Sequence, residues 1–285
     1  RQSVKHKKTF DYIFNKTEAI TLEQSKLTLS KDITVLSFSD SSMVDRNSSI
    51  IKVDSGWIVY SKNSESSILS FTSDGQFSGY IGHRGNGPGE YTSVYDVVVN
   101  QKSKVLEVLS DGGIFCYTFG GDFLDKKEVT YPAFSFAIDD RQNYWFYVGN
   151  NTTYGDAKMI CTDENIANVA YYLHQKSNML PMVENNFGRN GEWLTFHESL
   201  NHDLYTIENG KLDLSYAMDF PNYKLPKKLH ELSGMEVIEE LQRSNYASII
   251  NYLENHDYIF LNVLLNNEGC LLYTSPSPRD GLLSR

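Results

Sequence analysis

Short runs of aromatic and β-branched residues recur along the chain. Side chains of these types favour a pleated, half-buried strand over a helix. We therefore expect each run to form an inner strand of a small sheet. The runs are Trp57-Ile58-Val59-Tyr60, Val105-Leu106-Glu107-Val108, Tyr144-Trp145-Phe146-Tyr147, Trp193-Leu194-Thr195-Phe196 and Tyr258-Ile259-Phe260-Leu261.

The distance from each of the first four runs to a following tight turn is nearly constant. Asp74-Gly75, Gly121-Asp122, Glu164-Asn165 and Asn209-Gly210 lie 16 to 20 residues after the start of their run. These residue types tolerate the left-handed backbone of a hairpin. The first four runs begin 39 to 49 residues apart, and the last interval is 65 residues because it holds an insertion. Periods of about 40 to 50 residues are typical of propeller blades, so we predict an all-β fold, a β-propeller with four to five four-stranded blades present.

The chain divides into three predicted segments. Residues 1–47 would supply a strand that closes the ring, residues 48–269 form an incomplete propeller, and residues 270–285 form a non-native tail. Inside the propeller, Ser233 and Glu236 have the spacing of a capping box, and Met235, Ile238 and Leu241 share one helical face. We therefore expect a helical insertion around residues 228–245. It is either a lid on one rim of the ring or a plain connecting helix.

Both ends of the chain indicate a truncated fragment. Residues 270–285 resemble the in-frame translation of a sequencing adapter, and they abandon the alternating pattern of residues 258–264. The alternative is a natural tail rich in Ser and Pro. The first residue is an arginine, so we expect the reading frame to extend upstream.

Composition restricts the partners. The formal net charge is −10, and this acidic balance argues against nucleic acid. No apolar run approaches the length of about 18 residues that a membrane helix needs. Within residues 1–269, Cys116 and Cys161 fall in predicted strands, and we expect buried free thiols rather than a disulfide framework or a metal site.

A Gly-rich stretch between the first two blades carries a family resemblance. Residues 80–91, which read Tyr-Ile-Gly-His-Arg-Gly-Asn-Gly-Pro-Gly-Glu-Tyr, and the strands after them resemble an NHL-type repeat. The stretch is most similar to the hallmark of uncharacterised six-bladed propeller proteins of gut-type Gram-negative bacteria. Residues 201–207 and the Asp219-Phe220 pair also resemble that family.

The resemblance implies six blades in the full protein, no established catalytic residues and no cofactor. It also implies a periplasmic or cell-surface location, as an outer-membrane lipoprotein in the full-length form. Contact with the membrane would then occur only through a lipid anchor upstream of this fragment.

The Gly-rich stretch permits two interpretations from its residues alone. Its glycines allow unusual backbone angles and Pro88 stiffens the chain, as a crossover between two blades requires. Alternatively it is a ligand site, in which Arg84 binds a carboxylate or phosphate, Asn86 and Glu90 contact hydroxyls, and Tyr91 stacks on a sugar.

Two other groups of residues suggest chemistry that their pattern does not favour. His197, Glu198, His202 and Asp203 do not have the helical spacing of a zinc site, so we expect a solvated hairpin turn. Trp57, Trp145 and Trp193 occupy similar places in their runs, and we expect them to pack between blades rather than to form a sugar platform.

The predicted function is a non-catalytic, ligand- or protein-binding propeller of the bacterial cell envelope. Its partner would be a glycan, a peptide or an envelope protein. The alternative is a propeller lyase or hydrolase that holds a divalent metal on the central axis with His, Asp or Glu from several blades.

Overall fold

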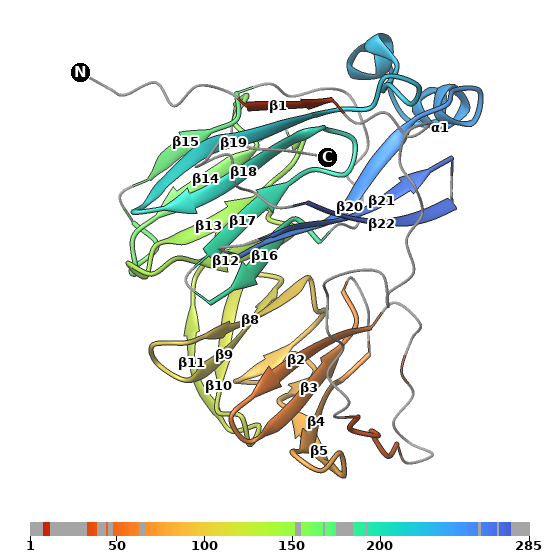
Figure 1. The fold of residues 1–285 in the computed structure, drawn as a ribbon. Coiled ribbons are helices and arrows are strands. Elements are labelled where there is room, and N and C mark those ends of the chain that lie inside the picture. Colours follow the sequence, from red (N-terminus) through yellow and green to blue (C-terminus); the bar gives the residue numbers. More distant parts are fainter. Residues whose placement is uncertain are drawn as a thin grey trace. The chain divides into compact units, whose positions relative to one another are not determined.

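The computed structural model consists mainly of small antiparallel β-sheets (Figure 1). The chain separates into two compact units, residues 18–136 and residues 1–17 together with 137–285. The structure describes residues 8–11, 33–38, 44, 48–62, 66–151, 155–167, 169–174, 185–191, 193–255, 258–266 and 268–274.

The unit of residues 18–136 holds two four-stranded sheets. In each sheet consecutive strands pair as antiparallel neighbours. The first contains β2 (Ser49–Val53), β3 (Gly56–Tyr60), β4 (Ile68–Thr72) and β5 (Phe77–Ile81), and the second contains β8 (Asp96–Asn100), β9 (Val105–Ser110), β10 (Gly113–Tyr117) and β11 (Phe123–Lys127). A short parallel pair, β6 (His83–Arg84) and β7 (Glu90–Tyr91), lies between them in sequence.

The other unit holds two further sheets of the same kind. One contains β12 (Ser135–Ile138), β13 (Tyr144–Tyr147), β14 (Met159–Thr162) and β15 (Ala170–Tyr172). The next contains β16 (Phe187–Asn190), β17 (Trp193–His197), β18 (Asp203–Glu208) and β19 (Lys211–Asp219), and β1 (Lys8–Asp11) adds to β19 as a parallel fifth strand. A three-stranded sheet follows, with β20 (Ala247–Glu254), β21 (Ile259–Leu265) and β22 (Glu268–Thr274).

The predicted fold class is confirmed: four successive sheets repeat the four-stranded meander of a β-propeller blade. Each predicted inner run coincides with the second strand of its sheet, β3, β9, β13, β17 or β21. In the four-stranded sheets these strands lie between two neighbours, and most of their residues are buried. The role of residues 1–47 in closing a ring stays a prediction.

The predicted turns are also found, each joining the third and fourth strands of a sheet. Asn209 and Gly210 both adopt positive φ, 56° and 72°, between β18 and β19. In the turn between β14 and β15 the left-handed residue is Ile166, with φ of 58°, and not the Glu164-Asn165 pair. A β-branched residue accepts this strained backbone because the turn is held by the Asp163 carboxylate, which accepts hydrogen bonds from the Asn165 and Ala167 amides at 3.0 Å each.

Buried carboxylates join successive sheets. In the first unit the Asp96 carboxylate forms a 2.9 Å ion pair with Lys62 and accepts a 3.4 Å hydrogen bond from the Tyr60 hydroxyl. Tyr60 ends β3 of the preceding sheet, and Lys62 follows it by two residues. In the second unit Glu198 is bound by Lys158 Nζ at 3.0 Å and by the Tyr147 hydroxyl at 2.7 Å. Tyr60 and Tyr147 each end the second strand of their sheet, so the same repeat position contributes to both clusters.

The predictions for the tryptophans are only partly correct, whereas the prediction for the cysteines is confirmed. Trp145 is fully buried, as core packing requires, whereas Trp193 is 39% exposed and its predicted packing role is wrong. Trp193 stands at the first position of β17, one place earlier than Trp145 in β13, so its side chain falls on the opposite face. Cys116 and Cys161 are buried free thiols, as predicted, and burial raises the pKa of each to about 12.

Strand β22 occupies the start of the predicted tail. It pairs with β21 from Glu268 opposite Leu265 to Thr274 opposite Ile259. The rest of the tail, residues 275–285, lies outside the described residues. The origin of residues 270–285 stays a prediction. Among the described residues, no helix has both the length and the apolar content to cross a membrane.

Candidate functional site

The four predicted ligand-binding residues of the Gly-rich loop are placed in three different environments. Arg84 and Asn86 are exposed, Glu90 is half-buried and Tyr91 is buried. Arg84 donates from Nε to the carbonyl of Thr92 at 2.9 Å, and Glu90 accepts from the amide of Gly87 at 2.8 Å. Both side chains thus hold the loop together, and the predicted role of Arg84, Asn86 and Glu90 in ligand binding stays a prediction.

The prediction that Tyr91 stacks on a sugar is wrong. Its side chain is 0% exposed, and its hydroxyl donates to the Ile81 carbonyl and accepts from the Ile68 amide, both at 3.2 Å. Its ring meets that of Tyr117 edge to face at 6.2 Å. Burial raises the pKa of Tyr91. A fully buried aromatic ring offers no face to a ligand.

The glycines of the loop are required by close packing. Gly82 has φ of 60°, and a Cβ there would lie 2.6 Å from the Tyr117 ring. Gly89 has φ of 75°, and a Cβ would lie 2.5 Å from the Phe123 ring. The Tyr117 ring is fixed, because its hydroxyl donates to the Gly89 carbonyl at 2.9 Å. The loop therefore has the features of a structural crossover.

The segment from His197 to Asp203 is a hairpin turn, as predicted, but it is not solvated at its start. His197 and Glu198 are 1% and 6% exposed. Neither ring nitrogen of His197 has a hydrogen-bond partner among the described residues, and burial lowers its pKa to about 4. Glu198 is satisfied instead by Lys158, Tyr147 and the Asn201 amide, which donates at 3.1 Å. The described residues contain no group of three or more His, Cys, Asp or Glu placed to hold a metal ion.

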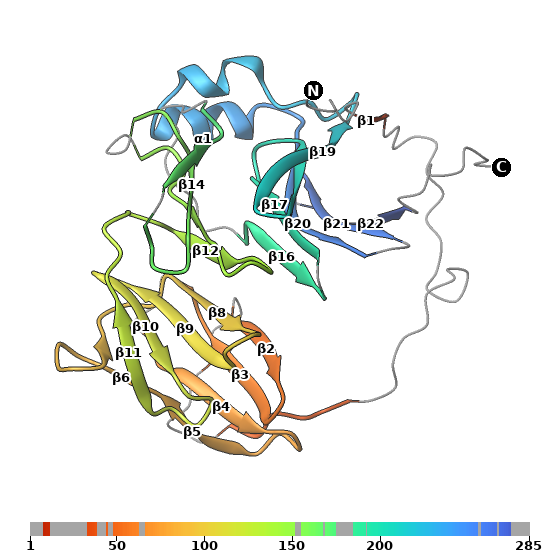
Figure 2. The ribbon, with the colours of Figure 1, turned by 90° about the vertical axis from the view of Figure 1, so that its left-hand side faces the viewer.

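A helical insertion joins β19 to β20, as predicted. It contains a 3-10 helix over Lys227–Glu231 and α1 (Met235–Gln242), and both lie beyond the ends of β19 and β20 (Figure 2). The capping box is half formed. The Glu236 carboxylate accepts from the Ser233 amide at 3.3 Å, but the cap position is taken by Gly234 and has no side-chain hydrogen bond.

Two apolar side chains anchor the insertion and two others remain outside. Leu229 and Val237 are 1% and 6% exposed. An ion pair of 2.7 Å between Lys228 and Glu240 joins the 3-10 helix to α1. Met235 and Ile238, on the face that the sequence predicted to be apolar, are 65% and 42% exposed. The predicted helical face exists, but it points away from the core.

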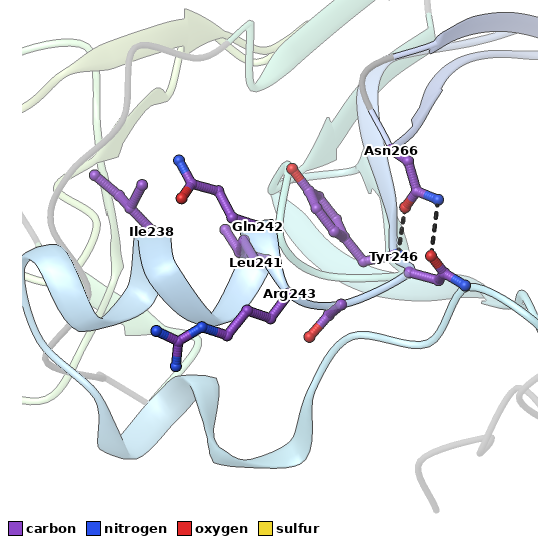
Figure 3. Close-up of a pocket in the computed structure, with 8 residues that line it drawn as sticks. Ile238, Leu241, Gln242, Arg243, Tyr246 and Asn266 are labelled. Carbon is purple, nitrogen blue, oxygen red and sulfur yellow. Dashed lines mark hydrogen bonds between the residues drawn. The ribbon is translucent and has the colours of Figure 1, made fainter.

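A hollow of 430 Å³ lies at the C-terminal end of α1 (Figure 3). Gln242 and Tyr246 project to one side of the chain, whereas Arg243 projects to the other. Asn266, in the turn between β21 and β22, closes the far side. The lining residues are Ile238, Leu241, Gln242, Arg243, Ser244, Asn245, Tyr246 and Asn266.

Side-chain amides fix the shape of the hollow. Asn266 donates from Nδ2 to Asn245 Oδ1 at 3.0 Å and accepts from the Tyr246 amide at 3.0 Å (Figure 3). Ser244 donates to the Glu240 carbonyl at 2.7 Å, which ties the end of the helix to the hollow. The arrangement combines apolar contact with neutral hydrogen-bonding groups, as small-molecule and peptide sites do.

Sequence reasoning did not select these lining residues. Gln242 follows Ile238 by four residues within α1, which is the only local signal that the two share a side, whereas Tyr246 lies beyond the end of the helix. Asn266 lies 20 residues after Tyr246 and reaches the hollow through the pairing of β20 with β21. No motif connects them in the sequence.

Comparison with known proteins gives a family and a fold. The family described as "Domain of unknown function (DUF4934)" matches residues 7–277. No curated protein matches the sequence.

Among the solved structures that resemble the chain are two from Bacteroides species. A Bacteroides fragilis protein whose name proposes that it is exported aligns with a TM-score of 0.70 and 16% identity, over 85% of this chain and 72% of that one. A member of the DUF4221 family from Bacteroides vulgatus aligns with a TM-score of 0.53 and 10% identity, over 85% and 81% of the two chains.

Proposed function

The chain belongs to the DUF4934 family, and we propose that it is a non-catalytic binding propeller of the bacterial cell envelope. Its ligand or partner protein would bind at the helical insertion. One observation carries this proposal. Met235 and Ile238 are exposed apolar side chains of α1, and Ile238 also lines the polar hollow of 430 Å³. Apolar side chains beside convergent hydrogen-bonding groups are typical of binding sites.

The envelope location is supported by a neighbour of the same fold, which bears a name that proposes export. We also propose that the full-length protein carries six NHL-like blades and is held at the outer membrane by a lipid anchor. These finer features follow from the resemblance of residues 80–91.

The experiment measures binding of the purified chain to envelope fractions of a Bacteroides strain. Biolayer interferometry would use peptidoglycan, capsular polysaccharide and solubilised outer-membrane protein as separate probes. We expect at least one fraction to bind, and Met235→Ser combined with Ile238→Ser to weaken that binding by about tenfold, or about 1.4 kcal/mol.

The matched control is Ile50→Ser, because Ile50 is 59% exposed on β2 of the other unit. This variant should bind as the unmodified chain does. Absence of binding to all three fractions would contradict the proposal. So would equal weakening by Ile50→Ser and by the double variant.

A further inference from the structure

The hollow at the end of α1 also restricts the chemistry of its ligand. Its lining contains one charged side chain, Arg243, and the Arg243 guanidinium lies 3.5 Å from the Glu239 carboxylate. No carboxylate lines the hollow. Arg243 projects to the opposite side of the chain from Gln242 and Tyr246 (Figure 3), so a ligand held against Gln242 and Tyr246 would face neutral groups.

The remaining hydrogen-bonding groups of the hollow are neutral. The Gln242 amide, the Asn245 Nδ2 group and the Tyr246 hydroxyl make no hydrogen bond to another described residue. The Gln242 amide and the Tyr246 hydroxyl can each donate and accept a hydrogen bond, and the Asn245 Nδ2 group can donate. Ligand hydroxyls, which also donate and accept, can pair with such groups. The hydrogen bonds of Asn266 hold the Asn245 side chain and the backbone at Tyr246 in place.

The apolar part of the hollow is small. Tyr246 presents a half-buried ring, and Ile238 and Leu241 add aliphatic surface on the helix side (Figure 3). The Tyr246 side chain has an aromatic face and a terminal hydroxyl, so it suits a ligand that has one apolar face and hydroxyl groups along its edge. The volume of 430 Å³ lies near the lower end of ligand sites, which span about 300 to 1,000 Å³.

From these three features we propose that the hollow binds a neutral saccharide of one or two rings, such as the end of an envelope glycan. Tyr246 contacts the C–H face of a ring, and Gln242 and Asn245 bind its hydroxyls. This inference rests on the proposed function, because it names the ligand of the same site.

The test uses saturation-transfer NMR and calorimetry on the purified chain. The neutral probes are N-acetylglucosamine, galactose and maltose, and the charged probes are glucuronic acid and glucosamine. We expect at least one neutral sugar to bind with a Kd on the order of 1 mM, and charged sugars to bind at least about tenfold more weakly. Tyr246→Ala should weaken binding about tenfold, and Gln242→Ala about threefold.

Tyr171→Ala is the control, because Tyr171 is an aromatic residue of the same unit that is 47% exposed on β15. It should leave sugar binding unchanged. A thermal melt of each variant separates loss of binding from loss of folding, and Gln242→Ala provides a second exposed position if Tyr246→Ala unfolds. The inference is overturned if no neutral sugar binds, if charged sugars bind as well, or if a blocked neutral tripeptide binds in their place.

The two proposals fail separately. An envelope fraction that binds through Met235 and Ile238, without competition by any neutral sugar, overturns the saccharide inference and supports the binding function. An absence of binding by every fraction and every sugar overturns both.

Discussion

The Gly-rich loop and the helical insertion differ in how they use their polar groups. In the loop, Arg84 and Glu90 bond to its own backbone, and Tyr91 is buried. In the insertion, Met235 and Ile238 are exposed and Gln242 lines a hollow. The loop has a recognisable sequence because close packing restricts its residues, whereas the insertion has an ordinary sequence and an available surface. A conspicuous motif can therefore mark a structural junction rather than a site.

The largest effect should come from substituting a loop glycine. Gly82→Ala places a Cβ 2.6 Å from the Tyr117 ring at a φ of 60°. The left-handed backbone and the overpacking together should lower the free energy of unfolding by about 2 to 4 kcal/mol. Urea denaturation measures this change. Gly120→Ala is the control, because its Cβ would come no closer than 3.5 Å to another atom; an equal loss there would contradict the packing argument.

A fall in pH should destabilise the unit that carries the insertion. His197 packs near the backbone of Ile249 and Ile250 in β20, and its pKa falls from 6.5 to about 4 in the folded chain. Between these values the unfolded chain binds a proton that the folded chain excludes, so stability decreases as the pH falls from 6.5 towards 4. Relative to pH 7, the loss at pH 5 from this residue should be about 2 kcal/mol.

Urea midpoints at pH 7 and pH 5 test this effect in the unmodified chain and in His197→Gln. The variant should lose part of the pH dependence. His202, whose pKa burial also lowers, contributes with the same sign and remains in both proteins. If His197→Gln has the same pH dependence as the unmodified chain, His197 is not the cause of the loss of stability in acid.

A smaller effect should follow removal of the Glu90 carboxylate. Glu90→Ala leaves the Gly87 amide without the acceptor that now lies 2.8 Å away, and we expect a loss of about 1 kcal/mol in the free energy of unfolding. Glu128→Ala is the matched control, since Glu128 is 78% exposed and pairs with Lys126 at the surface. Its loss should stay below about 0.5 kcal/mol.

The smallest effect is expected at the exposed tip of the loop. Arg84→Ala combined with Asn86→Ala should change binding to envelope fractions by less than about twofold, or about 0.4 kcal/mol, because we propose that the ligand binds at the insertion. The same interferometry measures it. A tenfold loss would instead make the loop a ligand site, as one interpretation of its sequence proposed.

The sequence predicted the parts of the fold that depend on local properties. The apolar second strands and the turn at Asn209-Gly210 were found because strand pairing and left-handed backbone favour particular residue types. The insertion helix was also predicted, from the spacing of Met235, Ile238 and Leu241. Which side of that helix is buried could not be predicted, because burial depends on what the rest of the chain covers.

The candidate site was not predictable for a related reason. Tyr91 and Tyr246 both have polar neighbours in the sequence, yet Tyr91 is fully buried and Tyr246 lines the hollow. Asn266 reaches the hollow only because β20 and β21 pair. The buried partner of Glu198, Lys158, is 40 residues away. Such contacts are set by the packing of sheets, and no short window of sequence contains them.

The pairing of Lys158 with Glu198 has a consequence for how related sequences can diverge. Both side chains are less than 10% exposed, and each neutralises the other's charge. Loss of one would leave the other as an unpaired buried ion and would lower the free energy of unfolding by roughly 3 to 5 kcal/mol. That is a large part of the total stability of a typical domain. Lineages descended from a common ancestor should therefore retain the two positions together or replace them together, and an alignment deep enough to reveal correlated changes should show the two positions varying together.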